Sequence, residues 1–283
     1  MAELLGLIAG DGDFPLEIAR SARRQGRRVY AVGFHGLTRA ELGEVTDELT
    51  WLHLGQVEAL LGSLCGAGVA DVVMAGKVDK THLQGAGGRL RLDARARRLL
   101  ADLPDHRDTS ILALLASALE EQGLALCPQT DWVPHLLLGE GPLGKLAPSD
   151  AQWRDIHAGW PIARRIAADE VGQCVVVKAG AVVAVEAMEG TDATIRRAAS
   201  LVGAGTTVVK VARPHQDPRF DVPVIGAGTL DGLIDAGAGV LAIEAGATVV
   251  LDREAVIRRS NRHGIALVGL APAGPTDLSG AGE

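Results

Sequence analysis

The sequence predicts an α/β fold built from two domains, and three observations support this prediction. Apolar runs rich in Val, Ile and Leu alternate with segments of helical periodicity along most of the chain, a rhythm typical of parallel sheets whose strands are joined by helices. The composition is poor in aromatic residues, at 3%, and includes 36 glycines, which suits layers that meet at small residues. A length of 283 residues leaves room for one large or two ordinary domains, at roughly 100–200 residues per domain.

We expect the first domain to span residues 1–139 and to contain a Rossmann-like parallel sheet. Its strand and helix signals alternate from an opening apolar run, Leu4–Ala9, to a last helix over 109–122. The glycine- and proline-rich stretch 140–148 is the predicted linker. Strand and helix signals then resume at Asp150, so residues 149–283 are predicted to form a second α/β domain, which carries the catalytic carboxylates proposed below.

The charge balance and the cysteines exclude several classes of protein. With 28 basic and 35 acidic residues the net charge is −7, which disfavours a nucleic-acid partner. Cys65, Cys127 and Cys174 form no CxxC pair and are expected to be buried side chains in a reducing compartment. No apolar run approaches the roughly 18–20 residues of a membrane span, and the start of the chain lacks a signal-peptide pattern. We therefore expect a cytoplasmic protein, and the sequence leaves a homo-oligomer open.

A glycine-rich turn, Gly10-Asp11-Gly12-Asp13, separates the first strand from a helix that has Pro15 near its start. Glycines at such a turn let backbone amides approach a phosphate at the helix N-terminus. The dinucleotide-binding fingerprint is incomplete, because its third glycine falls on Pro15 and no acidic residue ends the next strand. A ligand is thus expected at this turn, and a nicotinamide cofactor is disfavoured. Lys77 follows another strand and is either an anion contact or a solvated lysine.

Three carboxylates, Glu186, Glu189 and Asp192, lie within seven residues at a predicted strand-to-helix turn. Magnesium is held in proteins by one or two carboxylates together with phosphate oxygens of the substrate, so this turn is a candidate metal site. The alternative is that Thr191 or Asp192 only caps the following helix. Asp108, just before a helix of the first domain, has the same alternative.

A polar segment from Lys210 to Gly226 follows a β-branched run and contains three prolines, so it is neither a helix nor a central strand. It includes Arg213, Gln216, Asp217 and Asp221. Loops held at strand ends often carry binding and catalytic groups. The alternative is a solvated loop whose charges pair with one another.

Three segments, Leu5 to Pro15, Glu186 to Asp192 and Lys210 to Gly226, together resemble the LpxI-type UDP-2,3-diacylglucosamine pyrophosphatases. The similarity extends from the first strand to the last, and the latter two segments are its specific part. It implies hydrolysis of UDP-2,3-diacylglucosamine to UMP and 2,3-diacylglucosamine 1-phosphate (lipid X), an early step of lipid A synthesis. It also implies a divalent metal, Mg²⁺ or Mn²⁺, water attack on the α-phosphorus and a substrate held between two domains. Loose association with the cytoplasmic face of the inner membrane fits a diacylated substrate.

On this resemblance the essential carboxylate of the third segment falls on Asp221, which we expect to bind the metal or to orient water. Asp192 and Glu189 are the further candidate metal ligands. Arg213 replaces the lysine common in the family, which keeps the charge but changes the donor geometry. The alternative function is a non-catalytic or regulatory nucleotide-sugar-binding protein, which would need neither Asp221 nor a metal. The candidate substrate-binding residues are Gly12, Asp13, Lys77, Asp108, Thr191, Lys210, Arg213 and Gln216.

Overall fold

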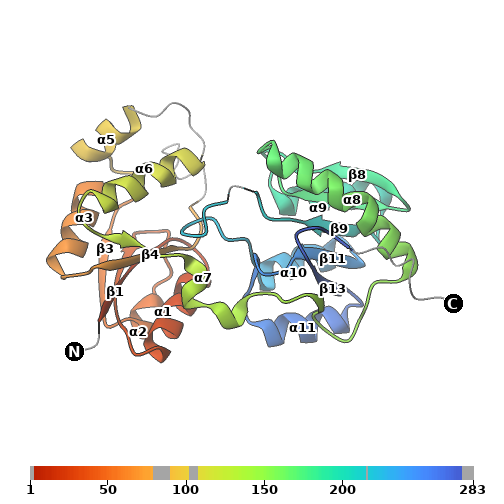
Figure 1. Ribbon diagram of the computed structural model, residues 1–283, viewed down its shortest axis with the longest axis horizontal. Coiled ribbons are helices and arrows are strands. Elements are labelled where there is room, and N and C mark those ends of the chain that lie inside the picture. Colours follow the sequence, from red (N-terminus) through yellow and green to blue (C-terminus); the bar gives the residue numbers. More distant parts are fainter. Residues whose placement is uncertain (1–2, 79–89, 102–107, 215, 276–283) are drawn as a thin grey trace. The chain divides into compact units, whose positions relative to one another are not determined.

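The computed structural model describes residues 3–78, 90–101, 108–214 and 216–275. The chain forms two compact units, one of Met1–Pro134 with Pro218–Phe220 and one of His135–Asp217 with Asp221–Glu283. Each unit has its own sheet (Figure 1), and each has its own buried apolar residues. The prediction of a two-domain α/β fold is confirmed.

The first unit contains an all-parallel sheet of five strands in the order β3-β2-β1-β4-β5. Its central strand, β1, is apolar along its length and is buried from Leu5 to Ala9, as expected for a strand covered on both faces. The order reverses direction next to β1, and ligands of such sheets bind at the carboxyl ends of the strands at that point. The strands are β1 (Leu4–Ala9), β2 (Arg28–Phe34), β3 (Glu48–Leu52), β4 (Asp71–Ala75) and β5 (Ala125–Leu126).

The helices of the first unit are amphipathic and cover the sheet. In α1 the residues Leu16, Ile18, Ala19 and Ala22 are buried, whereas basic residues close its last turn. The first-unit helices within the described residues are α1 (Phe14–Arg24), α2 (Leu42–Val45), α3 (Val57–Gly66), α5 (Ala94–Ala101), α6 (Asp108–Glu120) and α7 (Gln129–Trp132).

The second unit is built on a mixed sheet of six strands in the order β6-β13-β11-β9-β7-β8. The three central strands β9, β11 and β13 are parallel, while β7 runs antiparallel to β9 and forms a hairpin with β8. The carboxyl ends of β8, β9 and β11 therefore lie at one edge of the sheet. The strands are β6 (Gly141–Pro142), β7 (Cys174–Lys178), β8 (Ala181–Val185), β9 (Thr207–Lys210), β11 (Val240–Glu244) and β13 (Ala266–Leu270), and β10 (Val224–Ile225) pairs separately with β12 (Val249–Val250).

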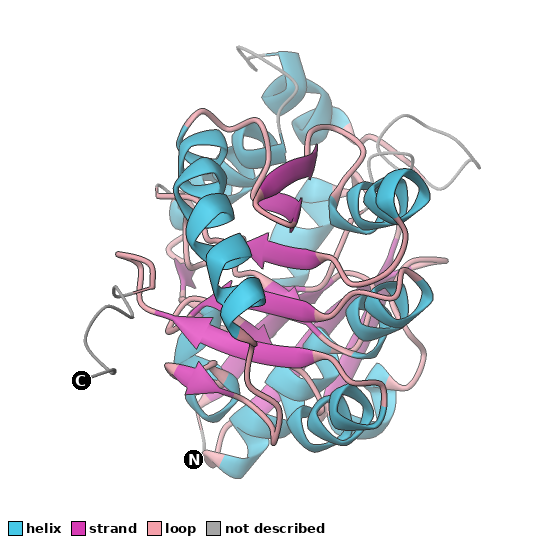
Figure 2. Ribbon diagram, turned by 90° about the vertical axis from the view of Figure 1, so that its right-hand side faces the viewer, coloured by secondary structure: helices cyan, strands magenta, loops and turns pink. Residues whose placement is uncertain are grey.

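Helices lie on both faces of this sheet (Figure 2). Val209 and Ala242 pack in one core with α8 (Asp150–Ala168), and the neighbouring Val208 and Ile243 pack in the other core with α9 (Thr191–Val202), α10 (Ala227–Asp235) and α11 (Arg253–Arg262). This alternation follows from the period of two in a strand. It assigns each side chain at the ends of β9 and β11 to a face.

The glycine- and proline-rich segment 140–148 belongs to the second unit, whereas the chain passes from one unit to the other between Pro134 and His135. β6 pairs with β13, and Leu143 N donates to Leu267 O at 2.8 Å. A segment of turn-forming residues thus adds an edge strand, where a proline is tolerated. Among the described residues no helix has both the length and the apolar character needed to cross a membrane.

Candidate functional site

The two glycine turns of the first unit lie against each other at the carboxyl ends of β1 and β4. Asp11 N donates to Lys77 O at 2.8 Å and Lys77 N donates to Asp11 O at 2.9 Å. Gly12 and Gly76 have φ of +95° and +96°, values that favour glycine. A Cβ on Gly76 would lie 2.7 Å from Asp11 O, so the turns can approach only because this residue is glycine. The predicted residues Gly12 and Lys77 are brought to one place.

Asp13 is the N-cap residue of α1, but its side chain makes no capping hydrogen bond. Its carboxylate forms an ion pair with Arg39, which also contacts Glu41 at 2.8 Å. The hydrogen bond to Glu41, and then the charge of Asp13, raise the pKa of Arg39. Arg39 therefore balances the negative charge of Asp13 beside the turn, a partner that the sequence motif did not indicate.

A cluster of rings, His35, Trp51 and His53, lies where β2 and β3 end. The His35 ring stacks on Trp51 with centroids 5.7 Å apart and lies 4.8 Å from the His53 ring. Burial, and then the charge of Arg91 and the proximity of His35, lower the pKa of His53. Its Nδ1 is buried and has no hydrogen-bond partner among the described residues. The cluster was missed from the sequence, although the adjacency of strand ends in a parallel sheet would have pointed to it.

The main polar cluster of the second unit joins β8, β9 and α9. Lys210 lies opposite Cys174 in the β7–β9 pair, and Glu186 N donates to Cys174 O at 2.9 Å. Lys210 Nζ donates to Thr191 Oγ1 at 3.2 Å, and that hydroxyl donates to Glu186 Oε1 at 3.0 Å. Lys210 and Glu186 are only 9% and 7% exposed. A hydroxyl group thus links a buried cation to a buried anion, and Glu186, one of the three carboxylates at the predicted turn, is part of this link.

α9 begins without a side-chain cap, because its N-cap is Gly190, with φ of +80°. The alternative of a plain cap at Thr191 or Asp192 is therefore wrong. Asp192 is exposed in the first turn, where the helix dipole favours negative charge. Glu189 has both oxygens engaged: Oε1 accepts from Arg197 at 2.6 Å and Oε2 from Ala187 N at 3.1 Å. Backbone hydrogen bonding at Glu189 itself, followed by Arg197, lowers the pKa of Glu189.

The loop after β9 folds back on itself through backbone and side-chain contacts. Arg213 N donates to Gln216 Oε1 at 3.1 Å, and Gln216 N donates to Arg213 O at 3.1 Å. Arg213 Nη1 lies 3.4 Å from Asp221 Oδ2, and Asp221 N donates to Asp217 O at 3.1 Å. Arg213 Nε is buried and has no hydrogen-bond partner within the described part of the chain. Arg213, Gln216 and Asp221 are thereby brought together.

The remaining predicted residues are not drawn into one cluster. Across residues 3–78, 90–101, 108–214 and 216–275 no three His, Cys, Asp or Glu side chains converge as metal ligands. α6 begins at Asp108, whose side chain lies outside the described residues. Burial, with Glu186 as the next cause, raises the pKa of the Cys174 thiol to about 12, which argues against a cysteine nucleophile at this edge of the sheet.

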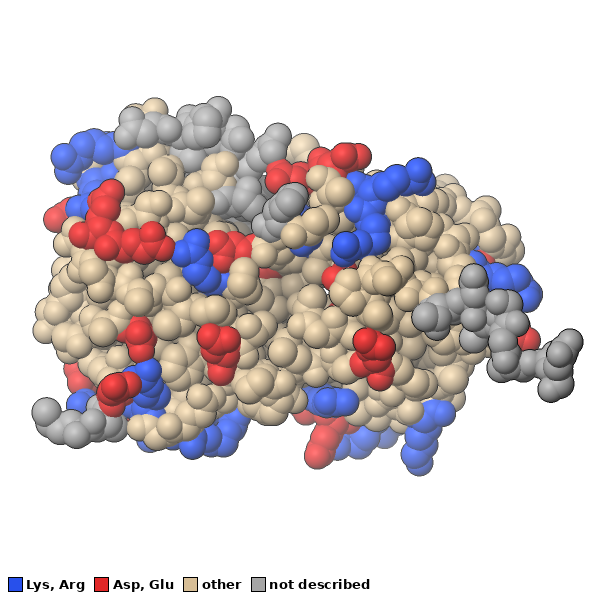
Figure 3. All heavy atoms as spheres, viewed as in Figure 1, with Lys and Arg blue, Asp and Glu red and all other residues tan. Residues whose placement is uncertain are grey.

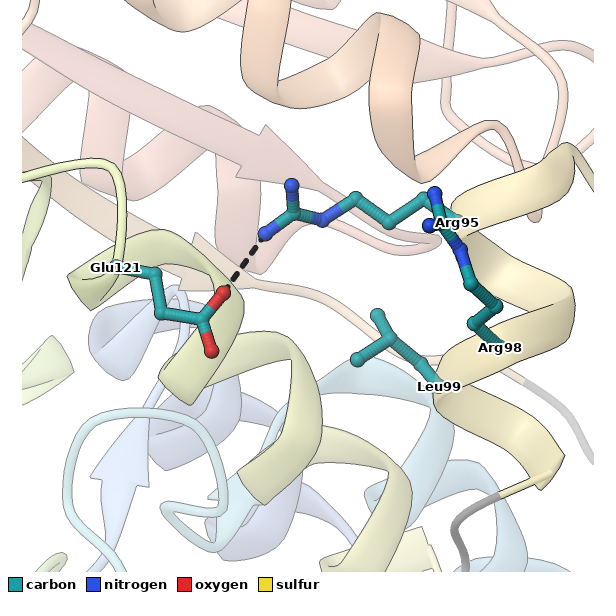
Figure 4. A pocket seen from close by; sticks show the side chains of 4 residues that line it. All are labelled: Arg95, Arg98, Leu99 and Glu121. Atoms are coloured by element: carbon teal, nitrogen blue, oxygen red, sulfur yellow. Dashed lines mark hydrogen bonds and ion pairs between the residues drawn. The ribbon is translucent and has the colours of Figure 1, made fainter.

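Two surface hollows carry arginines but contain no predicted site residue. One is lined by Arg20, Arg23, Arg24 and Val45. The other is lined by Arg95, Arg98, Leu99 and Glu121, and the Arg95–Glu121 ion pair at 2.8 Å lies across it (Figure 4). On the face drawn in Figure 3 basic and acidic side chains are interspersed. These arginines are therefore not part of the candidate site.

The fold and the site define a two-unit α/β protein. In the first unit glycine turns lie at the ends of strands, and in the second unit cations and carboxylates do, as in proteins that bind anionic ligands. A family model described as the LpxI N-terminal domain matches residues 4–136, and one described as the LpxI C-terminal domain matches residues 139–268. The chain belongs to the LpxI family. A relative from Caulobacter vibrioides, named UDP-2,3-diacylglucosamine pyrophosphatase LpxI, is 30% identical over 279 residues, which cover 95% of this chain and 98% of that protein.

Two solved structures resemble this chain only weakly. The crystal structure of gox2253 is 20% identical, with a TM-score of 0.27 over 42% of this chain and 32% of that one. The leucoanthocyanidin reductase–NADPH complex from Vitis vinifera is 15% identical, with a TM-score of 0.24 over 42% of this chain and 47% of that one. The chain spans less than half of either structure, and TM-scores this low support no inference.

Proposed function

We propose that this protein hydrolyses UDP-2,3-diacylglucosamine by attack of water on the α-phosphorus, giving UMP and 2,3-diacylglucosamine 1-phosphate in lipid A synthesis. The observation that carries the proposal is the similarity along nearly the whole chain to a relative named for this pyrophosphatase activity. A cytoplasmic location, with loose contact to the inner membrane, belongs to the same proposal because the substrate is diacylated.

The second-unit cluster suits the chemistry of a diphosphate. A diphosphate carries several negative charges, so catalysis depends mainly on positioning and on neutralising oxygens. Lys210 and Arg213 supply cations, and the unpartnered Arg213 Nε offers a donor to a phosphate oxygen. The first turn of α9 adds backbone amides with no helical partner of their own. Glu186, through Thr191, balances Lys210 and holds it at the end of β9.

The proposal includes a divalent metal, which the described residues can hold only if oxygens of the substrate supply part of its coordination. No all-protein set of three ligands forms among the described residues, and the oxygens of Glu189 are already engaged. Asp221, together with Asp192, would hold Mg²⁺ or Mn²⁺, with substrate oxygens completing the coordination. When bound, the metal would neutralise phosphate oxygens and acidify water. Asp221 would orient the attacking water, since its carboxylate stays about one-third exposed beside Arg213.

The test is release of UMP from UDP-2,3-diacylglucosamine, measured with Mg²⁺, with Mn²⁺ and with a chelator. Asp221→Asn should lower kcat by about 10²–10⁴-fold, the range of a lost acid–base group, while the protein stays folded. Asp217→Asn, four residues earlier in the same loop, is the matched control and should keep most of the activity. Absence of product with every metal would refute the proposal and favour a binding protein. Equal losses in both variants would refute the assignment to Asp221.

A further inference from the structure

A buried glutamate, Glu244, ends β11 and has no part in the cluster described so far. Its side chain is 7% exposed. Its Oε2 accepts two hydrogen bonds, from Arg164 Nη1 of α8 at 2.9 Å and from the backbone amide of Ala212 at 3.0 Å. Burying a carboxylate is unfavourable unless such partners are present, so this placement needs a reason.

Glu244 lies on the face of the sheet opposite to Lys210. Along β11, Ala242 packs in the α8 core and Ile243 in the core of α9–α11, so Glu244 returns to the α8 face. Along β9 the alternation places Lys210 on the same face as Val208, in the α9–α11 core. Glu244 is therefore separated by the sheet from the cation that would contact phosphate. Its connection to the site passes through the backbone of Ala212.

Ala212 is where the loop leaves the sheet. β9 ends at Lys210, and Ala212 is the last residue before Arg213. Ala212 is only 7% exposed, and its backbone amide donates to the Glu244 side chain rather than to a neighbouring strand. The bond fixes the direction of the chain at the point from which Arg213 reaches Asp221 at 3.4 Å.

We propose that Glu244 is a positioning residue for the reaction: by holding the Ala212 amide it aims the Arg213 side chain toward Asp221. The inference rests on the proposed function, since it concerns the reaction for which these residues are aimed. Arg164 balances the charge of Glu244. Because the Arg164 side chain is 32% exposed, it can turn to water when Glu244 is replaced.

The chain offers a matched control in Asp155. This residue is also buried, at 5% exposure, and lies on α8. It accepts a backbone hydrogen bond from Gly180 N at 2.6 Å and one from the Thr207 hydroxyl at 3.3 Å. Gly180 is in the β7–β8 turn and Thr207 begins β9, so Asp155 acts at the other edge of the same sheet, away from the loop.

The experiment compares kcat, KM and thermal stability for wild type and four variants, Glu244→Met, Glu244→Gln, Arg164→Gln and Asp155→Asn. Glu244→Met loses the acceptor for Ala212 and should lower kcat by about 100-fold, the cost of misplacing a catalytic group by about 1 Å. Glu244→Gln retains an acceptor and should lose about tenfold. Arg164→Gln leaves the Ala212 bond in place and, like Asp155→Asn, should keep kcat within about threefold whatever it does to stability.

Amide hydrogen exchange of the segment 211–221 provides a second readout that does not need turnover. Exchange there should accelerate in Glu244→Met and not in Asp155→Asn. An active wild type with wild-type kcat in both Glu244 variants would overturn the inference and leave the function intact. A wild type that forms no UMP would overturn the function itself. If Glu244→Met does not fold, Glu244→Gln against Asp155→Asn decides the question by the same comparison.

Discussion

Replacing Thr191 with Val tests the buried link between Lys210 and Glu186. The change keeps the shape of the side chain and removes only the hydroxyl. Lys210 Nζ would lose an acceptor at 3.2 Å, and Glu186 Oε1 would lose a donor at 3.0 Å. Both charged groups are largely buried, so water replaces these partners poorly.

The expected loss of stability follows from these two contacts. A hydrogen bond to a charged group contributes about 1.5–3 kcal/mol, and some water reaches the half-buried Thr191. We therefore expect Thr191→Val to cost about 2–4 kcal/mol in the free energy of unfolding. The matched control is Thr194→Val, one turn later on α9. Thr194 is fully buried, but its hydroxyl donates only to Gly190 O, at 2.9 Å, which its own amide also contacts, so that change should cost about 1 kcal/mol.

Urea unfolding, followed by fluorescence and circular dichroism together, measures both variants. With a slope of about 2 kcal/mol per molar urea, Thr191→Val should lower the midpoint by about 1–2 M and the control by about 0.5 M. Coincidence of the two probes shows that a single transition is being compared. Equal shifts for the two variants would refute the reasoning, since they would mean that the charged partners contribute nothing beyond an ordinary hydroxyl contact.

Two further predictions concern the glycine turns and the thiols. Gly76→Ala should destabilise the protein by about 2–4 kcal/mol, because φ is +96° and the new Cβ would meet Asp11 O at 2.7 Å. The control Gly123→Ala, where φ is +75° but a Cβ has open space, should cost about 1 kcal/mol. Comparable urea midpoints for the two variants would contradict this account. Cys174, whose pKa is about 12, should have a thiolate fraction of about 10⁻⁴ at pH 8 and resist a thiol reagent that labels Cys65, which is exposed although the sequence predicted a buried side chain. Rapid labelling of Cys174 in the folded protein would show that the reagent reaches this thiol and would contradict the prediction.

Most of the first unit could be predicted from its sequence because its signals are local. Apolar runs such as Leu4–Ala9 and glycine turns recur in a rhythm that only a parallel sheet accommodates. β6 could not be predicted in this way. Gly141-Pro142 has the composition of a linker, and its strand character comes from pairing with Val268 and Gly269 on β13, a long-range contact that leaves no local pattern.

The same distinction separates the site residues that were predicted from those that were missed. Thr191 and Lys210 lie in polar motifs at the ends of predicted strands, and such motifs indicate a binding or catalytic site. In the sequence, Glu244 is a single charge within an apolar run. Only its hydrogen bonds with Arg164 and Ala212 in the structure indicate a role for it. Partners of this kind are set by strand register and by which helix covers which face, neither of which can be read from one segment alone.

The loop after β9 is anchored at its start by buried contacts on both faces of the sheet. An exposed ion pair contributes about 0–1 kcal/mol, and the Arg213–Asp221 pair is 3.4 Å long with both side chains about one-third exposed. A loop paired only with itself would therefore be weakly fixed. The end of β9 is instead held on one face through Lys210, Thr191 and Glu186, and two residues later on the other face through Glu244. Because these anchors are buried and the pair is not, the course of the chain at Arg213 is set by the sheet from which the loop departs.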